Sequence, residues 1–215
     1  MVMAGQYFVD QVLNTTVNDT PWQHQLVRNS LPADVFTRLQ QQCEQLLHSE
    51  YTINEMAKTG IDRKFISPDQ FKDYGIDLYD EIRDVCQKVL DNAEQLTKGL
   101  YANPRWYDRL TVYAHIAVVP SVENVINQIH QEEAQKMWSS VTYIAPEKNF
   151  GTKMYTAKDE STFVAEAEWQ PNNSFIFCGQ KGVTWHKYQS SGVPRVSFNM
   201  FLLDATRKRY FVSNC

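Results

Sequence analysis

The first hundred residues carry apolar side chains at helical spacing. In the stretch "SLPADVFTRLQQQCEQLLHSE", apolar residues recur at intervals of four, four and three positions: Val35, Leu39, Cys43 and Leu46. These side chains would share one face of a helix, and Ser30 is suited to cap its N-terminus. The pattern therefore predicts an amphipathic helix that buries this face.

A second helical stripe lies between Ser67 and Gly99. Ser67 and Pro68 are typical of a helix start, and Gly99 is suited to end the helix. Its apolar face consists of Ile82, Val85, Val89 and Leu96. The sequence thus predicts two helices in this part of the chain.

The segment between the two stripes, residues 51–67, has no regular pattern. Its sequence "YTINEMAKTGIDRKFIS" is mixed in charge, which predicts a long loop. Two roles stay open for Arg63 and Lys64: contacting an acidic group over a pocket, or forming a solvated surface.

The pattern changes near residue 103 to short runs rich in Val, Ile, Tyr and Phe. These runs are "LTVYAHIAVV", "VINQIH", "WSSVTYIA", "TFVAEA", "SFIFC" and "RVSFNMFLL", with turn-like groups such as "APEKNFGT" and "GQKG" between them. Many short strands at regular spacing predict a sandwich or jelly roll and not alternating βαβ units. The expected fold class is α+β, mainly β: a double-stranded β-helix (jelly roll) with N-terminal helices packed on one sheet.

The expected domain organisation follows from this change of pattern. We expect one domain over residues 1–215, with a helical support region over about 1–100 and a jelly-roll core over about 103–210. Roughly eight strands are expected between residues 110 and 203.

Composition narrows the class of partner. The net charge of −4 gives no reason to expect nucleic acid or an anionic membrane surface. No apolar run is long enough to span a membrane, and the N-terminus lacks the pattern of a secretory signal. The four cysteines are far apart and resemble reduced thiols, so a soluble, cytoplasmic protein is expected.

The first candidate for chemistry is the pair His130 and Glu132. On a strand these two side chains would point into the same space, because alternate residues share a face. The pair alone has little weight, since 25 of the 215 residues are acidic. It gains weight only from its context.

That context is supplied by "GVTWHKYQSSGVPRVSFNMFLL", which contains His186 and Arg195. Arg195, Ser197 and Asn199 would share one face of a strand whose other face is apolar. A buried arginine needs a partner for its charge, and its planar fork suits a carboxylate. Two histidines and one carboxylate leave three positions of a metal open, which suits ferrous iron that binds a chelating cosubstrate and oxygen together.

The stretch from His130 to Leu203 resembles the iron(II)- and 2-oxoglutarate-dependent oxygenases. The pieces that carry the resemblance are, in order, "HQE", "SSVTYIAP", "GTKMY", "WQPNNSFIFC" and "WHKYQSSGVPRVSF". The chain departs from the family pattern at Glu132, where Asp is commoner, although some members use Glu. The close resemblance covers about 75 residues and does not extend specifically to the helical part.

The resemblance implies roles for seven residues. His130, Glu132 and His186 would be the iron ligands and catalytic residues, and Arg195 would bind the distal carboxylate of 2-oxoglutarate. Ser197, Tyr143 and Tyr113 would assist in binding this cosubstrate. The implied reaction uses O2, releases succinate and CO2, and usually hydroxylates an unactivated C–H bond.

Each of these residues also has an ordinary structural interpretation. His186, Tyr143 and Tyr113 could be core residues, Arg195 half of an ion pair, and Ser197 a polar strand residue. His115 could line the pocket or be buried for structural reasons, whereas His24 and His48 are expected to be solvated.

Other functions stay open. A halogenase-like relative would lack the carboxylate ligand and is disfavoured by Glu132. A non-catalytic jelly-roll binding module and a cosubstrate-free cupin-type metalloprotein are the alternatives. The sequence contains no zinc-protease, P-loop or GxSxG motif. A small molecule or amino acid is the expected substrate, with a protein side chain next, and the oligomeric state is left open.

Overall fold

Helices and strands contribute about equally to the fold, so the chain is α+β with more helix than the pattern indicated. The computed structural model describes residues 3–47, 63–100, 110–119, 128–189 and 192–204. The helices are α1 (Ala4–Leu13), α2 (Ala33–Leu47), α4 (Tyr79–Asp91) and α5 (Ala93–Lys98), with 3-10 helices η1 (Pro68–Tyr74) and η3 (Glu160–Thr162). The strands are β1 (His24–Val27), β2 (Lys64–Ile66), β3 (Leu110–Val119), β4 (Lys136–Ala145), β5 (Thr152–Tyr155), β6 (Phe163–Glu166), β7 (Ser174–Phe177), β8 (Trp185–Tyr188) and β9 (Arg195–Asp204).

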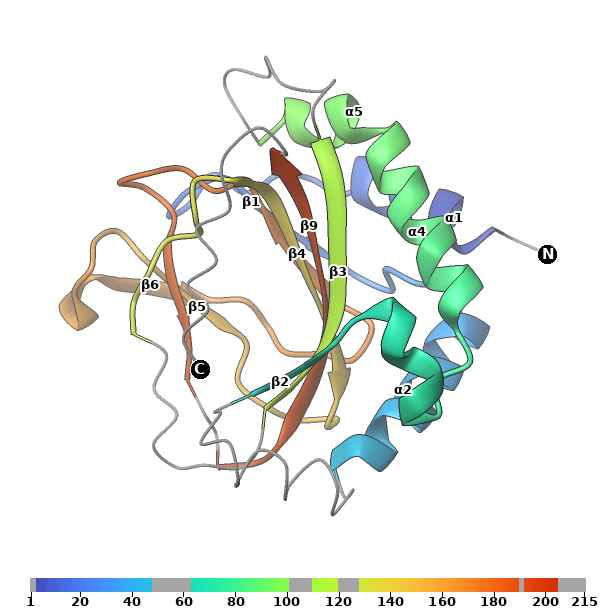
Figure 1. The fold of residues 1–215 in the computed structure, drawn as a ribbon. Coiled ribbons are helices and arrows are strands. Elements are labelled where there is room, and N and C mark those ends of the chain that lie inside the picture. The colour runs from blue at the N-terminus through green and yellow to red at the C-terminus, as the bar shows by residue number, and fades with distance from the viewer. Residues whose placement is uncertain (1–2, 48–62, 101–109, 120–127, 190–191, 205–215) are drawn as a thin grey trace.

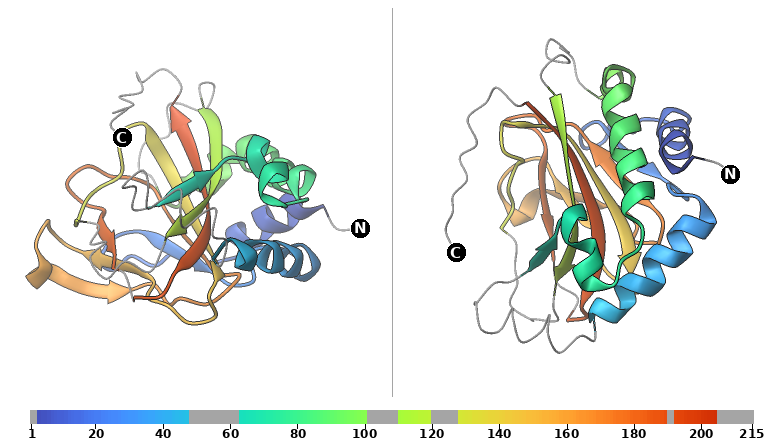
Figure 2. Two further views of the ribbon diagram at one scale, coloured as in Figure 1. Left: turned by 60° about the horizontal axis from the view of Figure 1, so that its bottom comes forward. Right: turned by 45° about the vertical axis from the view of Figure 1, so that its right-hand side comes forward.

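The strands form two antiparallel sheets. The large sheet has the order β1-β7-β4-β9-β3-β2, and the small sheet has the order β6-β5-β8. Figures 1 and 2 show the helices on one face of the large sheet and the small sheet on its other face. An isolated backbone pair between His130 and His186 extends the small sheet by one residue beside β8. From β3 to β9 the chain therefore passes repeatedly between the two sheets.

Two apolar clusters fill the spaces between these layers. The larger one joins the helices to the large sheet and includes Phe8, Leu39, Ile82 and Phe198. The inter-sheet cluster consists of Trp22, Tyr143, Met154, Ala167, Trp169, Phe175 and Phe177. Burial of these side chains is the main favourable contribution to folding, because it removes large apolar surfaces from water.

Strand β9 divides its side chains between the two spaces as the alternation predicted. The helix-facing cluster contains Val196, Phe198, Met200 and Leu202. Arg195, Ser197 and Asn199 alternate with them and face the small sheet. The strands predicted over 141–144 and 197–202 are also confirmed, as parts of β4 and β9. Between residues 110 and 203 the described part of the chain contains seven strands and the His130 bridge.

The N-terminal part is less uniformly helical than predicted. It contributes β1 and β2, which form the two edges of the large sheet. Residues 51–62 of the predicted loop lie outside the described residues, whereas its end forms β2. Helix α1 is an additional element that the helical stripes did not indicate. None of the described helices has the length and apolar character needed to cross a bilayer.

The second predicted helix is interrupted. Ser67 and Gln70 form a capping box, so the predicted start is confirmed, but they open the short η1. Gly75 then adopts a left-handed conformation with φ 71° and ends this turn. Glycine suits this position because it lacks the Cβ that disfavours positive φ. The apolar stripe is therefore carried by α4 and α5 together.

Ser30 does not cap α2, contrary to the prediction. Its side chain is buried, and its hydroxyl lies 2.8 Å from the Ser174 hydroxyl and 3.5 Å from the Asn172 side-chain oxygen. Ser30 thus links the start of α2 to the loop before β7. The stripe of α2 itself is buried as predicted.

Candidate active site

His186 lies on β8, and His130 lies beside it as its backbone partner. Their backbones exchange hydrogen bonds of 3.0 and 2.9 Å, and their ring centroids are 4.5 Å apart. The Nδ1 atom of His130 lies 2.9 Å from the Gln128 carbonyl, and that of His186 lies 3.0 Å from the Thr184 carbonyl. Because a carbonyl oxygen can only accept, each Nδ1 carries a proton, so Nε2 is the ring nitrogen that could act as an acceptor or ligand.

Burial keeps the ring of His186 neutral. It lowers the pKa of His186 to about 4, although the charge of Glu132 favours the protonated form. The ring also packs against Phe177, with the centroids 4.8 Å apart. At neutral pH its Nε2 is therefore unprotonated, which is the form that can bind a metal.

Glu132 completes the pair that the sequence singled out. Its side chain is only 11% exposed, and Oε1 lies 3.7 Å from Nε2 of His186. Burial alone would raise the pKa of Glu132, but the charge of Lys136, electrostatic interactions with the two imidazole rings and the hydrogen bond from Lys136 outweigh it and lower the pKa. The carboxylate is therefore ionised at neutral pH.

Lys136 holds the Glu132 carboxylate. Its Nζ donates to Oε2 over 2.7 Å and lies 4.3 Å above the ring of Phe201. Within the described ranges, no three His, Cys, Asp or Glu side chains form a group that could hold a metal. Two imidazoles and a carboxylate are donor types that suit ferrous iron, but the carboxylate of Glu132 is ion-paired with Lys136 in this arrangement.

Arg195 is a buried cation at the start of β9. Its guanidinium carbon lies 3.1 Å from the centroid of Tyr188 and 5.8 Å from that of Trp169. Burial lowers the pKa of Arg195 to about 10, so the side chain stays charged at neutral pH. Among the residues that the structure describes, Nε and Nη1 of Arg195 and the hydroxyl of Tyr188 have no hydrogen-bond partner. A buried cation whose own N–H groups and neighbouring hydroxyl lack acceptors is chemically suited to bind an anion such as a carboxylate.

Tyr143 and Ser197 lie close to Arg195. They are direct partners in the pairing of β4 with β9. The Tyr143 hydroxyl donates to the Thr152 hydroxyl over 3.4 Å and accepts from the Thr152 amide over 3.2 Å. Burial raises the pKa of Tyr143, while the charge of Arg195 partly offsets this. The structure thus brings three of the predicted cosubstrate residues together.

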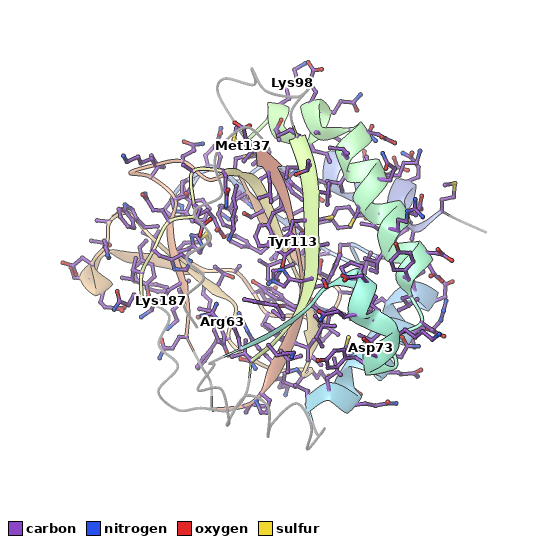
Figure 3. All side chains as sticks on the ribbon, viewed as in Figure 1. Arg63, Asp73, Lys98, Tyr113, Met137 and Lys187 are labelled. Atoms are coloured by element: carbon purple, nitrogen blue, oxygen red, sulfur yellow. The ribbon has the colours of Figure 1, made fainter. Side chains whose placement is uncertain are left out.

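Tyr113 lies further along the large sheet. It pairs with Phe201, six residues from Arg195 on β9, which is a distance of roughly 20 Å along a strand. Its ring stacks on Phe201 with centroids 6.4 Å apart and is 40% exposed. Figure 3 shows it over the middle of the large sheet. In the described conformation Tyr113 therefore belongs to the end of the site near Lys136 and not to the Arg195 end.

A chain of hydrogen bonds runs from Ser197 to His115 across β9 and β3. The Ser197 hydroxyl donates to Asn199 over 3.0 Å, and the Asn199 amide nitrogen lies 3.2 Å from Nε2 of His115. Because that amide donates, Nε2 accepts and Nδ1 carries the proton. This Nδ1 is buried without a partner in the described part of the chain. Burial, with the charges of Lys136 and Arg63, lowers the pKa of His115 to about 3.

The sequence patterns did not identify Lys136 or Tyr188 as site residues, and they left the role of His115 undecided. Spacing could have identified the first two. Tyr188 follows His186 by two residues on a strand, so both face the same space, and Lys136 follows Glu132 by four. Gly179 gives no such signal, although a Cβ there would lie 3.3 Å from that of Glu132. Its contribution is visible only in three dimensions.

Comparison with known proteins relates this arrangement to solved structures. No protein-family model and no curated protein sequence matches the chain. A prolyl-4-hydroxylase from Pseudomonas putida matches with a TM-score of 0.51 and 14% identity over 91% of this chain and 96% of that one. The chain shares the fold of a hydroxylase.

Two further structures agree with this. A prolyl hydroxylase in complex with a hypoxia inducible factor peptide fragment, from Trichoplax adhaerens, matches with a TM-score of 0.52 and 11% identity over 93% of this chain and 89% of that one. The dioxygenase for auxin oxidation in rice matches with a TM-score of 0.53 and 13% identity over 81% and 71%. The resemblance inferred from the motifs is thus confirmed for the fold.

Proposed function

We propose that this protein is an iron(II)- and 2-oxoglutarate-dependent oxygenase built on a double-stranded β-helix. The observation that carries the proposal is the buried Arg195 beside Tyr188, two residues along β8 from His186. This arrangement would place a binding site for a carboxylate close to a pair of histidines whose Nε2 atoms are available. The passage of the chain between two sheets, from β3 to β9, supports the jelly-roll topology.

The proposed roles of the metal-site residues follow from their donor atoms. His130, His186 and Glu132 would hold iron, because two imidazole nitrogens and a carboxylate fit a divalent ion. The carbonyls of Gln128 and Thr184 fix the two rings with Nε2 free. Bound iron would supply the activation of O2 that couples decarboxylation of 2-oxoglutarate to oxidation of a C–H bond.

The other residues would bind and orient the cosubstrate. Arg195 and Tyr188 would hold its distal carboxylate, with Ser197 and Tyr143 beside them. The inter-sheet cluster would exclude water from this contact, which strengthens a charge-assisted hydrogen bond. Tyr113 would contribute at the other end of the site.

The substrate is proposed as a class only. A small molecule or amino acid stays the first candidate, and a protein side chain is the second. The second candidate is supported by the peptide bound to the Trichoplax adhaerens neighbour.

A binding module without turnover is the alternative function. The ion pair between Glu132 and Lys136 favours it, because this pair occupies the carboxylate that iron would need. A cupin-type metalloprotein without a cosubstrate is disfavoured by the buried Arg195, which such a protein would leave without an anion.

Anaerobic titration distinguishes these functions. Ferrous iron is added to the protein, followed by 2-oxoglutarate, and the visible absorbance and succinate formation are measured. His186→Ala and Glu132→Ala should lose iron binding, whereas Glu133→Ala, a change at the neighbouring exposed carboxylate, should keep it. Iron binding without any response to 2-oxoglutarate would indicate the cupin-type function, and binding of neither would indicate the non-catalytic module.

A further inference from the structure

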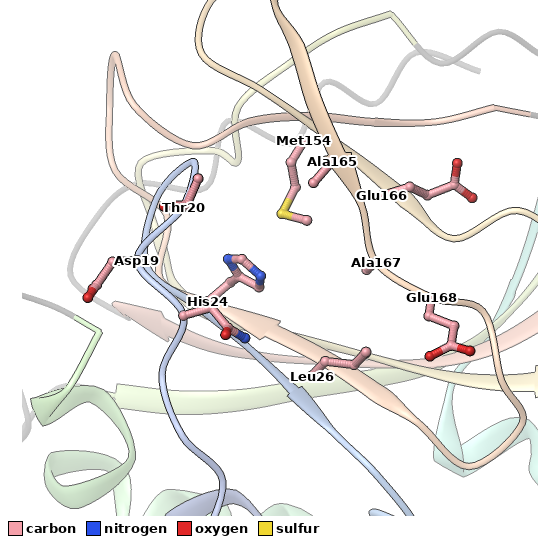
Figure 4. A pocket seen from close by; sticks show the side chains of 10 residues that line it. Asp19, Thr20, His24, Leu26, Met154, Ala165, Glu166, Ala167 and Glu168 are labelled. Carbon is pink, nitrogen blue, oxygen red and sulfur yellow. The ribbon is translucent and has the colours of Figure 1, made fainter.

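A hollow lies where the edge strands β1 and β6 of the two sheets come together. It is a pocket of about 410 Å³ between the segment around β1 and strands β5 and β6. Figure 4 shows the side chains that line it. Strand β6 is the edge of the small sheet furthest from β8, but Met154 on β5 is the direct partner of His186, so the pocket adjoins the histidine pair without containing either histidine. Its size is in the range of small-molecule sites.

His24 points into this pocket. It was expected to be solvated, but it lies in β1 and is only 7% exposed. Its Nδ1 lies 2.8 Å from the carbonyl of Trp22, so Nδ1 carries the proton and Nε2 is an acceptor. Within the described residues, no hydrogen bond satisfies Nε2. Burial also lowers the pKa of His24, which keeps the ring neutral.

Three carboxylates accompany His24 at the pocket wall: Asp19, Glu166 and Glu168. No lysine or arginine is among the described residues that line it. Each carboxylate has acceptor capacity left, because a carboxylate can accept several hydrogen bonds. Asp19 accepts from Gln23 over 3.3 Å and Glu166 from the Gly151 amide over 2.8 Å.

Within the described ranges, Glu168 has one weak partner. Its carboxylate is 4.0 Å from Arg28, and both side chains are mostly exposed. An exposed pair at this distance contributes little to stability, so Glu168 is available to another cation.

The rest of the lining contains two polar residues, Asn18 and Thr20, and an apolar surface. Leu26, Met154, Ala165 and Ala167 contribute to it. Met154 also belongs to the inter-sheet cluster, which gives the pocket a firm base. The pocket therefore combines an apolar surface with charged and neutral acceptors.

We propose that this pocket binds a small organic cation, an ammonium or guanidinium group on a short apolar chain. The charged end of such a molecule would meet Nε2 of His24 in the negative field of the surrounding carboxylates, while its chain would cover Leu26 and Met154. An anion of the same size would be repelled by three negative charges. This site is independent of the oxygenase proposal, because it shares no residue with the histidine pair or with Arg195.

The test uses n-butylammonium chloride as the probe, with butyrate and n-butanol as matched compounds of opposite and zero charge. The imidazole C–H resonances of the purified protein are followed by NMR, and His24 is assigned by loss of its signal in His24→Gln. Butylammonium should shift the His24 resonance in a saturable manner and leave that of His115, on β3, unchanged. Equal shifts with butyrate or butanol would overturn the proposal.

Amide substitutions test the charges without changing shape. Glu166→Gln and Asp19→Asn should each raise the dissociation constant for butylammonium roughly two- to fivefold, because each removes one exposed negative charge from the pocket wall. Glu94→Gln, the same change at an exposed position on α5, should leave it unchanged. If both pocket variants bind like Glu94→Gln, the carboxylates do not recognise a cation and the proposal is wrong.

Discussion

The guanidinium carbon of Arg195 lies 3.1 Å from the centre of the Tyr188 ring, where the end of β8 meets the start of β9. The ring covers one face of the cation and so stabilises it without using its in-plane N–H groups. Nε and Nη1 have no partner among the described residues, and neither does the Tyr188 hydroxyl. These donors are therefore available to an anion such as a carboxylate.

Substitution of Arg195 tests this contact directly. Arg195→Met should raise the dissociation constant for 2-oxoglutarate roughly ten- to a hundredfold, and Arg195→Lys should raise it less, because it keeps the charge but loses the fork. Calorimetric titration under anaerobic conditions measures both. Arg83→Met, at an exposed position on α4, is the control. Unchanged binding by Arg195→Met would mean that the arginine is structural.

Tyr188 allows the stacking and the hydroxyl to be separated. Tyr188→Phe keeps the ring over Arg195 and removes one donor, so 2-oxoglutarate binding should weaken by about fivefold, as expected for one hydrogen bond. Tyr188→Leu removes both and should weaken it further. The same titration measures the two variants. Equal binding by both would show that the ring contributes nothing.

The period of the apolar pattern predicted much of the fold and of the candidate site. The alternation in β9 separated Arg195 and Ser197 from the apolar face, because side-chain direction on a strand depends only on local geometry. The pairing of β1 with β7 could not be predicted in this way, since it joins residues about 150 positions apart. The same holds for the contact of Tyr188 with Arg195, which depends on how the two sheets are stacked.

Lys136 is expected to oppose metal binding. Its ammonium group is the counter-ion of Glu132, at 2.7 Å, so a divalent cation must compete with it for the carboxylate. Lys136→Met should therefore tighten binding of ferrous iron at pH 7. Anaerobic titration measures this, with Lys148→Met, an exposed lysine, as the control. Weaker binding in Lys136→Met would indicate instead that the lysine positions Glu132.

Stability should fall as the pH is lowered from about 6.5. The pKa of His115 is lowered to about 3 and that of His186 to about 4, both by burial. Between these values and 6.5 the unfolded chain binds protons that the folded chain cannot, so folding becomes less favourable as pH falls. Each histidine would contribute about 1.4 kcal/mol per pH unit in this window.

Urea unfolding at pH 7.5, 6.5 and 5.5 measures this slope. His115→Phe should reduce the slope, whatever its effect on stability at pH 7.5, because it removes one of the two histidines. His24→Gln should reduce the slope less, because the ring of His24 is less deeply buried. A slope that is unchanged in His115→Phe would show that His115 takes up its proton in the folded state.

Gly5 should be intolerant of alanine, although alanine is the better helix former. Helix propensity alone predicts that Gly5→Ala in α1 stabilises the protein by about 1 kcal/mol. In the fold, Gly5 packs against α4, where its amide donates to the Asp84 carboxylate over 2.8 Å. A Cβ would touch the Asp84 carbonyl oxygen and lie 2.6 Å from Cγ of Lys88. The lysine can move, but the backbone of α4 cannot move without cost, so Gly5→Ala should lower the free energy of unfolding by about 1–3 kcal/mol.

Gln6→Ala, on the exposed side of the same helix, should change the free energy of unfolding by less than about 0.5 kcal/mol. Urea denaturation at pH 7.5 compares the three proteins, and a stabilised Gly5→Ala would mean that α1 does not pack on α4 at this distance.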